Sequence, residues 1–269
     1  MSSKELLVVK LGGGEGLDMA AACNDLAGIS VERPLLVVHG VSAAMNQLCA
    51  ERGIEVQTLT SPSGHSSRYT PPEVRDVYVC AARHVNDSIV TALDLRGICA
   101  RGFSREDVAL YGDRKRAIRA LVNGRVRVVR DDYSGTIRRV DLAALKEAIK
   151  NEHVPVLPPM AKSEDGLLNV DGDRAAAAAA GALGAGTLVI LSNVRGLYRR
   201  FPDEDSFVNG VELSQIDDAL DWAQGRMKRK VLAAQEALTQ GVERVIVTNG
   251  RGRNAISQAL AGEGTWFTK

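Results

Sequence analysis

Apolar segments that run into a short glycine-containing turn and then a helix recur along this chain, and they restrict its fold more than any other feature. Residues 6–9 form one such segment before Gly12, and residues 35–38 form another before Gly40. Consecutive strand–turn–helix units predict a parallel sheet with helices on both faces. In such sheets ligands bind at the carboxyl ends of the strands, where both glycine turns are expected to lie.

The first of these turns has the composition of a phosphate site. Lys10 stands where the strand ends, and Gly12, Gly13 and Gly14 follow it closely. Glycines let backbone N–H groups approach a ligand, and a cation beside them favours phosphate. It is not a Walker A loop, because the lysine precedes the glycines, and Leu17 replaces the third glycine of a dinucleotide fingerprint. An ordinary strand-to-helix turn with a surface lysine is the alternative.

Composition restricts the class of protein. The chain has 269 residues, of which 45% are hydrophobic and 25% are charged, and its formal net charge is +1. These values predict a globular protein of one large unit or two lobes, and they argue against a general nucleic-acid binder. No apolar run approaches ~18 residues, so we expect no transmembrane helix, and the N-terminus shows no secretory signal pattern.

The cysteines and histidines show no metal-binding pattern. The four cysteines are widely spaced without a C-x-x-C motif, which favours reduced structural thiols and a cytoplasmic protein. The four histidines lack the spacing of metal ligands, so we expect no structural metal. These residues are Cys23, Cys49, Cys80, Cys99, His39, His65, His84 and His153.

A polar loop over residues 61–72 precedes a long amphipathic helix. Thr70 is expected to cap this helix, with Pro71 at its first position and Glu73 completing a capping box. Arg68 would then be held just before a fixed helix end, where a guanidinium suits bidentate binding of a carboxylate. A solvated loop arginine is the alternative.

Residues 113–140 are the most strongly charged region. Asn123-Gly124 between alternating side chains predicts a β-hairpin. Its cationic face is either merely solvated or meets an acidic macromolecule. The cations of this region include Arg114, Lys115, Arg116, Arg125 and Arg127.

Two features of the second half of the chain concern helix starts. Asp173 precedes an alanine-rich helix and is expected to cap it, which alone would explain the residue. A basic run up to Lys230 opens a helix expected over residues 231–238. Cations at a helix start oppose the helix dipole, so this run indicates a bound anion. The chain is expected to close on a polar turn over residues 262–265.

Taken together, these segments resemble the amino acid kinase family over essentially the whole chain. Within the family the chain is similar to acetylglutamate kinases, and above all to kinases that phosphorylate L-2-aminoadipate while a carrier protein holds its amino group. The resemblance is carried by Lys10, Gly12, Gly13, His39, Gly40 and residues 67–70, 169–173, 192–198 and 223–230.

The resemblance implies a three-layer αβα sandwich with a mainly parallel central sheet. It implies an acceptor lobe with the basic hairpin over residues 1–162, an ATP-binding lobe over residues 163–269, and a homodimer. The expected reaction moves the γ-phosphoryl group of ATP, with Mg²⁺, to a side-chain carboxylate in lysine biosynthesis. The expected partner is a small acidic amino-group carrier protein of the LysW type.

Alternative functions stay open. Acetylglutamate kinase activity in arginine biosynthesis, alone or as a second activity, is the nearest one. A nucleotide-monophosphate or carbamate kinase and a non-catalytic nucleotide-binding homologue are further ones.

The same resemblance implies residue roles. Lys10 and Lys230 would hold the transferring phosphoryl group, and Asp173 would keep the two lysines in register. Mg²⁺ would be held mostly by phosphate oxygens and water. The other expected contacts are Gly12, Gly13 and Gly40 for the phosphates; Gly40, Val41, Arg68 and Asn169 for the acceptor; Asn193, Gly196, Leu197, Tyr198, Val211 and Met227 for the nucleotide; and Arg114, Lys115, Arg116, Arg125 and Arg127 for the carrier.

One of these positions departs from the family pattern. Val41 stands where a second glycine commonly follows the His39-Gly40 pair. A β-carbon there is expected to narrow the approach to the phosphate or the acceptor.

Overall fold

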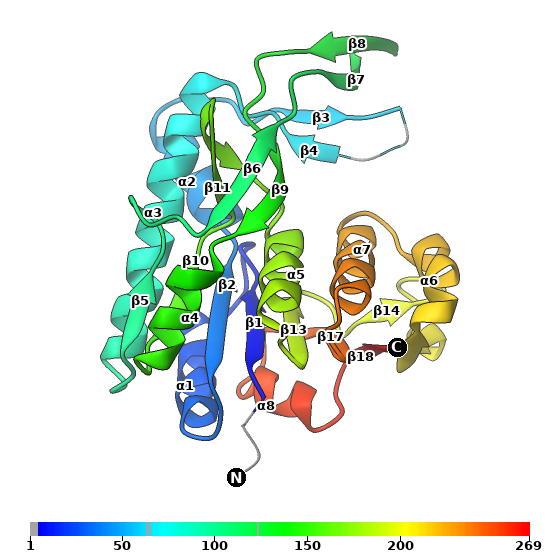
Figure 1. Ribbon diagram of the computed structural model, residues 1–269. Coiled ribbons are helices and arrows are strands. Elements are labelled where there is room, and N and C mark those ends of the chain that lie inside the picture. Colours follow the sequence, from blue (N-terminus) through cyan, green and yellow to red (C-terminus); the bar gives the residue numbers. More distant parts are fainter. Residues whose placement is uncertain (1–4, 63, 65, 123) are drawn as a thin grey trace.

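The computed structural model of this protein describes residues 5–62, 64, 66–122 and 124–269 and is an αβα sandwich (Figure 1). All neighbouring strands of its central sheet are parallel except β17 and β18. The strands follow in the order β16 (Gly210–Glu212), β18 (Thr265–Thr268), β17 (Arg244–Asn249), β13 (Thr187–Ser192), β1 (Leu7–Leu11), β2 (Leu35–His39), β10 (Val154–Leu157) and β5 (Ala100–Gly102).

Helices cover both faces of this sheet, which is why every residue of β1 is buried. Because side chains alternate along a strand, Val8 packs into one core cluster and Val9 into another. The first cluster includes side chains of α4 (Leu142–Lys150), α5 (Gly172–Leu183) and α7 (Arg226–Thr239). The second includes side chains of α1 (Met19–Ser30), α3 (Pro72–Asp94) and α8 (Ala255–Leu260). The expected sandwich is therefore confirmed.

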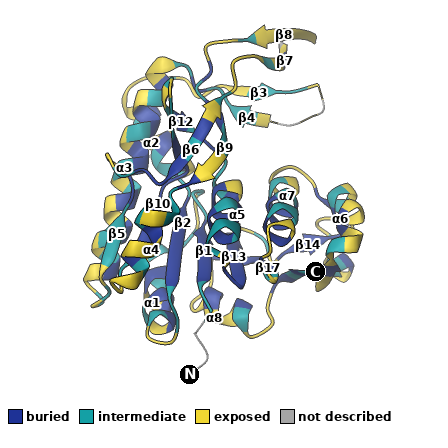
Figure 2. Ribbon diagram, viewed as in Figure 1, coloured by how far each residue is buried: buried dark blue, intermediate teal, exposed yellow. Residues whose placement is uncertain are grey.

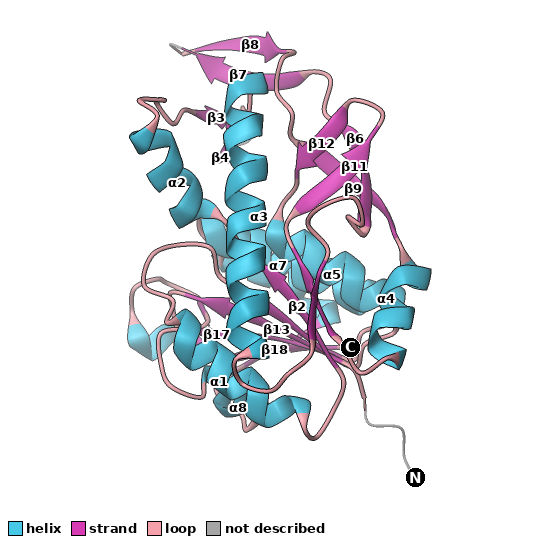
Figure 3. Ribbon diagram, turned by 90° about the vertical axis from the view of Figure 1, so that its left-hand side faces the viewer, coloured by secondary structure: helices cyan, strands magenta, loops and turns pink. Residues whose placement is uncertain are grey.

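A smaller layer lies beyond the carboxyl end of β2 (Figures 1 and 3). There α2 (Ser42–Glu51) packs on α3. A four-stranded sheet lies beside them, in the order β12 (Gly166–Asn169), β11 (Met160–Ser163), β6 (Leu110–Arg114) and β9 (Gly135–Val140). Two hairpins extend from this layer: β3 (Thr58–Thr60) with β4 (Ser66–Arg68), and β7 (Ile118–Val122) with β8 (Arg125–Val129).

The pairing of β7 with β8 confirms the predicted hairpin. Residue Asn123 of its turn lies outside the described residues, as do Ser63 and His65 of the loop between β3 and β4. Figure 2 shows that this hairpin is the most exposed part of the small layer.

The remaining elements lie on the far side of α7 from α5 (Figure 1). They are β14 (Leu197–Tyr198), β15 (Phe207–Val208), α6 (Ile216–Trp222) and the 3₁₀ turns η1 (Glu204–Ser206) and η2 (Leu213–Gln215). Beyond the predicted closing turn the chain continues into β18, whose Phe267 is fully buried. The expected end was wrong because a four-residue strand gains its stability from its neighbours rather than from local pattern.

The predicted cap of α3 is wrong. This helix begins at Pro72, and Pro71 occupies the cap position without any side-chain hydrogen bond. The hydroxyl of Thr70 is engaged elsewhere, because it accepts from Asn169 Nδ2 at 3.1 Å and donates to the carbonyl of Arg68. Thr70 therefore joins segments that are distant in sequence.

The predicted cap of α5 is also wrong, by two residues. The carboxylate of Asp171 caps this helix by accepting from the backbone N–H groups of Asp173 and Arg174, each at 3.0 Å. Asp173 lies inside the first turn instead, so its side chain is free for another role. Likewise, α7 begins at Arg226, which places the whole basic run within the helix.

Among the described residues, no helix combines the length and the apolar character needed to cross a membrane.

Candidate active site

One buried carboxylate joins two lysines that are far apart in the sequence. Lys10 lies in β1, Asp173 in the first turn of α5, and Lys230 in the second turn of α7. The two oxygens of Asp173 each lie 2.8 Å from an ammonium nitrogen, Oδ1 from Lys10 and Oδ2 from Lys230. The three residues are only 7%, 6% and 8% exposed. The structure thus brings together the three residues for which a catalytic role was expected.

The charges of this cluster favour an anion. Burial by itself would raise the pKa of Asp173, but the ammonium groups of Lys10 and Lys230 hold that pKa well below its ordinary value. Burial lowers the pKa of Lys230, and the Asp173 carboxylate opposes that lowering. With all three groups ionised, the cluster has one net positive charge in a site with little water, where electrostatic interactions are strong.

Two glycine turns meet beside this cluster. A β-carbon on Gly13 would lie 2.3 Å from the carbonyl carbon of Gly40, and one on Gly40 would lie 2.5 Å from the nitrogen of Gly13. Only glycine fits at either position, so backbone alone lines this part of the sheet edge. The N–H of Gly40 already donates to the carbonyl of Leu11 at 2.9 Å, which contradicts its expected role as a phosphate donor in this arrangement. That role stays a prediction for Gly12 and Gly13.

A buried polar pair supports the second turn, and sequence analysis missed one of its members, Asn86. Asn86 Nδ2 donates to Nε2 of His39 at 3.2 Å and to the carbonyl of Val156 at 2.9 Å. His39 Nδ1 faces the carbonyl of Gly40 at 3.3 Å. Burial lowers the pKa of His39 to about 4, so the ring is neutral at pH 7. A single asparagine within the apolar stripe of α3 was the signal that could have identified Asn86.

Arg68 and Asn169 lie near one another through Thr70. Arg68 ends β4 and donates from Nη2 to Asn46 Oδ1 at 2.6 Å, whereas its buried Nη1 has no partner among the described residues. Asn169 ends β12 and donates to Thr70. A buried guanidinium nitrogen without a partner is what an anionic ligand would satisfy.

Two further findings concern the acceptor side. The side chain of Val41 is 6% exposed and belongs to the same core cluster as Met45 of α2, while the expectation that its β-carbon narrows the site stays a prediction. Asp132, which sequence analysis missed, is fully buried. It accepts from the N–H of Thr70 at 2.8 Å and from that of Ser134 at 2.6 Å. This carboxylate ties the start of α3 to the loop before β9.

The residues expected to bind the nucleotide divide into two groups. Asn193 follows β13 and donates to the carbonyl of Glu15 in the first glycine turn, at 3.3 Å. The side chains of Leu197 and Val211 are instead buried in the large core cluster, and Met227 packs against it. The other two expected residues also have internal contacts: Gly196 lies against Thr265, and the Tyr198 hydroxyl donates to Glu204.

The cations expected to bind the carrier also differ among themselves. Arg114 donates to the carbonyls of Asp132 and Arg130, and its guanidinium lies 3.8 Å from the ring centroid of Tyr133. It therefore braces the loop before β9 rather than facing solvent. The cations that remain exposed are Lys115, Arg116, Arg125 and Arg127.

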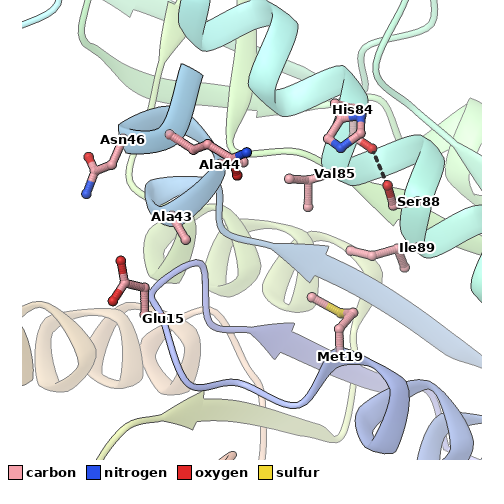
Figure 4. Close-up of a pocket in the computed structure, with 10 residues that line it drawn as sticks. Glu15, Met19, Ala43, Ala44, Asn46, His84, Val85, Ser88 and Ile89 are labelled. Carbon is pink, nitrogen blue, oxygen red and sulfur yellow. Dashed lines mark hydrogen bonds between the residues drawn. The ribbon is translucent and has the colours of Figure 1, made fainter. Parts of the chain in front are cut away.

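Two hollows lie outside this cluster. One of about 590 Å³ opens behind the first glycine turn, where Figure 4 shows Glu15 near Ala43 and Asn46 of α2, with His84 of α3 opposite. No residue for which a role was expected lines it. The other, of about 700 Å³, includes Arg116.

The described cysteines and acids hold no metal site. No group of three or more His, Cys, Asp or Glu side chains in the described ranges is arranged to bind a metal ion. Cys23 and Cys49 are buried, whereas Cys80 and Cys99 are exposed, so the expected structural role fits only the first two.

Comparison with known proteins identifies relatives along almost the full chain. The profile of the amino acid kinase family matches residues 5–249. A protein from Deinococcus radiodurans named LysW-aminoadipate kinase is 40% identical over 264 residues, which cover 97% of this chain and 90% of that protein. A protein of the same name from Thermus thermophilus is 42% identical over 266 residues, covering 97% of this chain and 99% of that protein.

A solved structure has the same fold. It is N-acetylglutamate synthase from Neisseria gonorrhoeae with coenzyme A and N-acetyl-glutamate, with a TM-score of 0.81 and 23% identity. The match covers 99% of this chain but only 60% of the length of that chain.

Proposed function

This chain belongs to the amino acid kinase family, and on that premise we propose that it phosphorylates the side-chain carboxylate of L-2-aminoadipate with ATP. The amino group of this substrate is held by a small acidic carrier protein of the LysW type. The observation that carries the proposal is the buried cluster of Lys10, Asp173 and Lys230 beside two touching glycine turns. The names of the two relatives support the acceptor and the carrier.

The chemistry needs positive charge more than it needs a base. A carboxylate is already ionised at pH 7, so no proton must be removed before it attacks phosphorus. The barrier comes from bringing this anion to the γ-phosphate, and from the charge that builds on the leaving diphosphate. Lys10 and Lys230 supply fixed positive charge at that point, and Asp173 keeps both ammonium groups in place without cancelling them.

The residues present fit a triphosphate. The backbones of Gly13 and Gly40 pack directly on one another, with no room for a β-carbon on either, and two lysines face one carboxylate next to them. Mg²⁺ would neutralise phosphate charge, held mostly by phosphate oxygens and water. Arg68 and Asn169 would hold the acceptor's α-carboxylate and its linked amide.

The two halves of the chain are proposed to bind different substrates. Residues 1–162 would form the acceptor lobe and contribute β1, β2, β5 and β10 to the central sheet. Residues 163–269 would form the ATP lobe and contribute β13, β16, β17 and β18. We also propose that the protein is a homodimer. Like the two lobes, the homodimer is inferred from the resemblance to the family.

The decisive experiment compares acceptors. We expect ATP-dependent acyl phosphate formation, trapped as the hydroxamate, to have the highest kcat/KM with carrier-linked aminoadipate and lower values with N-acetyl-2-aminoadipate and N-acetylglutamate. Equal values for N-acetylglutamate and the carrier-linked substrate would favour the acetylglutamate kinase alternative. No product with any acceptor would refute the kinase assignment.

Lys10 and Lys230 give the matching test of mechanism. Because each supplies one preorganised cation, Lys10→Ala or Lys230→Ala should lower kcat about 10²-fold or more. Thermal unfolding should remain cooperative, since Asp173 keeps one ammonium partner in either variant. A folded variant with near-normal kcat would remove that lysine from the phosphoryl site.

A further inference from the structure

Arg226 lies over the first glycine turn, although nothing above assigns it a role. It is the first residue of α7, and Gly225 before it has a φ of 53° and makes no side-chain cap. Its Nη1 is 3.7 Å from the point where a β-carbon on Gly14 would lie, the same distance as Asn193 Nδ2. The guanidinium thus reaches from α7 to the turn that is proposed to hold the phosphates.

The charge of Arg226 also acts on the acceptor side of the site. Burial is the main cause that lowers the pKa of Arg68, and the positive charge of Arg226 adds to that lowering. On α7, Arg226 precedes Lys230 by four residues, so both side chains project from the same face of the helix. Arg226 is therefore placed beside the turn proposed to hold the phosphates, and its charge acts on the arginine proposed to hold the acceptor.

The charge of Arg226 has no counter-ion in the described part of the chain, unlike the charges of Lys230, Arg229 and Arg174. Lys230 lies 2.8 Å from Asp173, Arg229 lies 3.5 Å from Asp171, and Arg174 of α5 lies 2.6 Å from a carboxylate of α7. Moreover, Arg226 stands in the first helical turn, where the helix dipole disfavours a cation. Arg226 is exposed, so water solvates its charge in the free protein, and a bound anion would supply the counter-ion that the described residues do not provide.

We propose that Arg226 contacts both the transferring phosphoryl group and the acceptor carboxylate, and offsets the repulsion between these two anions. The inference rests on the proposed function, because it needs both anions in one site. In the step itself a carboxylate oxygen bonds to the γ-phosphorus while the bond from that phosphorus to the bridging oxygen breaks. The electron pair leaves with ADP, no proton moves, and Arg226 forms no covalent bond.

The proposed role of Arg226 affects how strongly one bound ligand changes the Kd of the other, more than it affects the Kd of either ligand alone. A cation placed between two anions lets each bind in the presence of the other, whereas a residue that only supports the fold would weaken each ligand alone. The wild-type protein should therefore bind a non-hydrolysable ATP analogue and N-acetyl-2-aminoadipate nearly independently. In Arg226→Ala each ligand should weaken the other's Kd about tenfold or more, within the usual range of coupling between sites.

The experiment measures this coupling by titration calorimetry, together with the kinetics of carrier-linked aminoadipate. Arg226→Ala should lower kcat about 10²-fold, as expected for a lost preorganised cation, with a smaller change in the KM for ATP. Arg226→Lys, which keeps the charge, should recover part of both effects. Lys228→Ala is the matched control, because Lys228 is an exposed cation of the same helix without an ion pair in the described residues.

The outcomes separate the two proposals. One outcome would overturn only the role of Arg226. In it the wild type turns over, whereas Arg226→Ala keeps its kcat and the two ligands do not weaken each other's binding to that variant. A loss of kcat in Arg226→Ala that is matched in Lys228→Ala would also overturn it. Absence of wild-type turnover with every acceptor would overturn the proposed function, and the role of Arg226 with it.

Discussion

The state of Asp173 depends on its two partners. A buried carboxylate is costly without compensation, and removing one partner of a buried ion pair typically costs about 3–5 kcal/mol. Here two ammonium groups compensate a single carboxylate, so the cluster is both held together and left with positive charge. An ordinary buried salt bridge pairs one cation with one anion and is neutral, whereas this cluster has one more positive charge than negative charges.

His39 is a second residue whose environment sets its charge. Its pKa of about 4 is below the ~6.5 of an unfolded histidine, so between these values the unfolded chain binds the proton more readily. The stability that the neutral ring provides is therefore complete above pH 6.5 and decreases as the pH falls toward 4.

This difference gives a prediction for stability. Lowering the pH from 7 to 5 should cost the wild-type protein roughly 2 kcal/mol in the free energy of unfolding through His39. His39→Gln removes that titration, so urea unfolding at the two pH values should show a correspondingly smaller loss. An identical loss in both proteins would mean that His39 does not titrate in this range.

At the scale of elements, the start of α5 positions the carboxylate for which we propose a catalytic role. Asp171 caps the helix through the N–H groups of Asp173 and Arg174, and this fixes the backbone of Asp173 one residue inside the first turn. A cap is worth about 1 kcal/mol in stability. The same contact also orients the carboxylate that faces both lysines.

Substitution of the cap should therefore affect stability and turnover together. Asp171→Ala is expected to lower the free energy of unfolding by about 1 kcal/mol. Because Asp173 then loses its fixed backbone, kcat should fall as well, with little change in KM. Asp171→Asn keeps a capping oxygen and should stay close to the wild type in both measurements. If Asp171→Ala lost stability but kept its kcat, the cap would not position Asp173.

The β7–β8 hairpin is an element held at its base. Arg114, at the end of β6, donates hydrogen bonds to the carbonyls of Asp132 and Arg130, and its guanidinium stacks on the ring of Tyr133. These contacts connect the hairpin to the loop that also holds Thr70 through Asp132. A partner that docks on the hairpin would thus be held close to the start of α3.

At the scale of the whole molecule, charge is distributed unevenly. The formal net charge is only +1, yet exposed cations lie along the hairpin and just before it. Such a local patch raises the association rate of an acidic partner, and salt weakens the effect. A free small acceptor would depend on this patch much less.

Charge reversal on the hairpin tests this distribution. Arg127→Glu should lower kcat/KM for the carrier-linked substrate about tenfold at low salt, with the difference shrinking as salt is added. The value for N-acetyl-2-aminoadipate should change little. Lys146→Glu, which makes the same charge change on the exposed side of α4, is the control. Equal losses for both substrates would leave the hairpin as solvated surface.

The sequence by itself determined the layers of the protein and the residues that could bind phosphate. Apolar runs followed by glycine turns and helices specify a parallel sheet, because each element's pattern is local and repeated. For the same reason Lys10, Gly13 and Lys230 could be chosen as candidates. The hairpin was predictable because its turn and its two strands are adjacent in the chain.

Tertiary structure alone decided how these residues are used. Whether Asp171 or Asp173 caps α5 depends on which residue has extended backbone, and both are aspartates two positions apart. The hydrogen bond from the Gly40 N–H to Leu11, and the lack of a counter-ion for Arg226 among the residues that the structure describes, depend on segments distant in sequence. Burial and counter-ions are properties of neighbours in space, so local pattern cannot supply them.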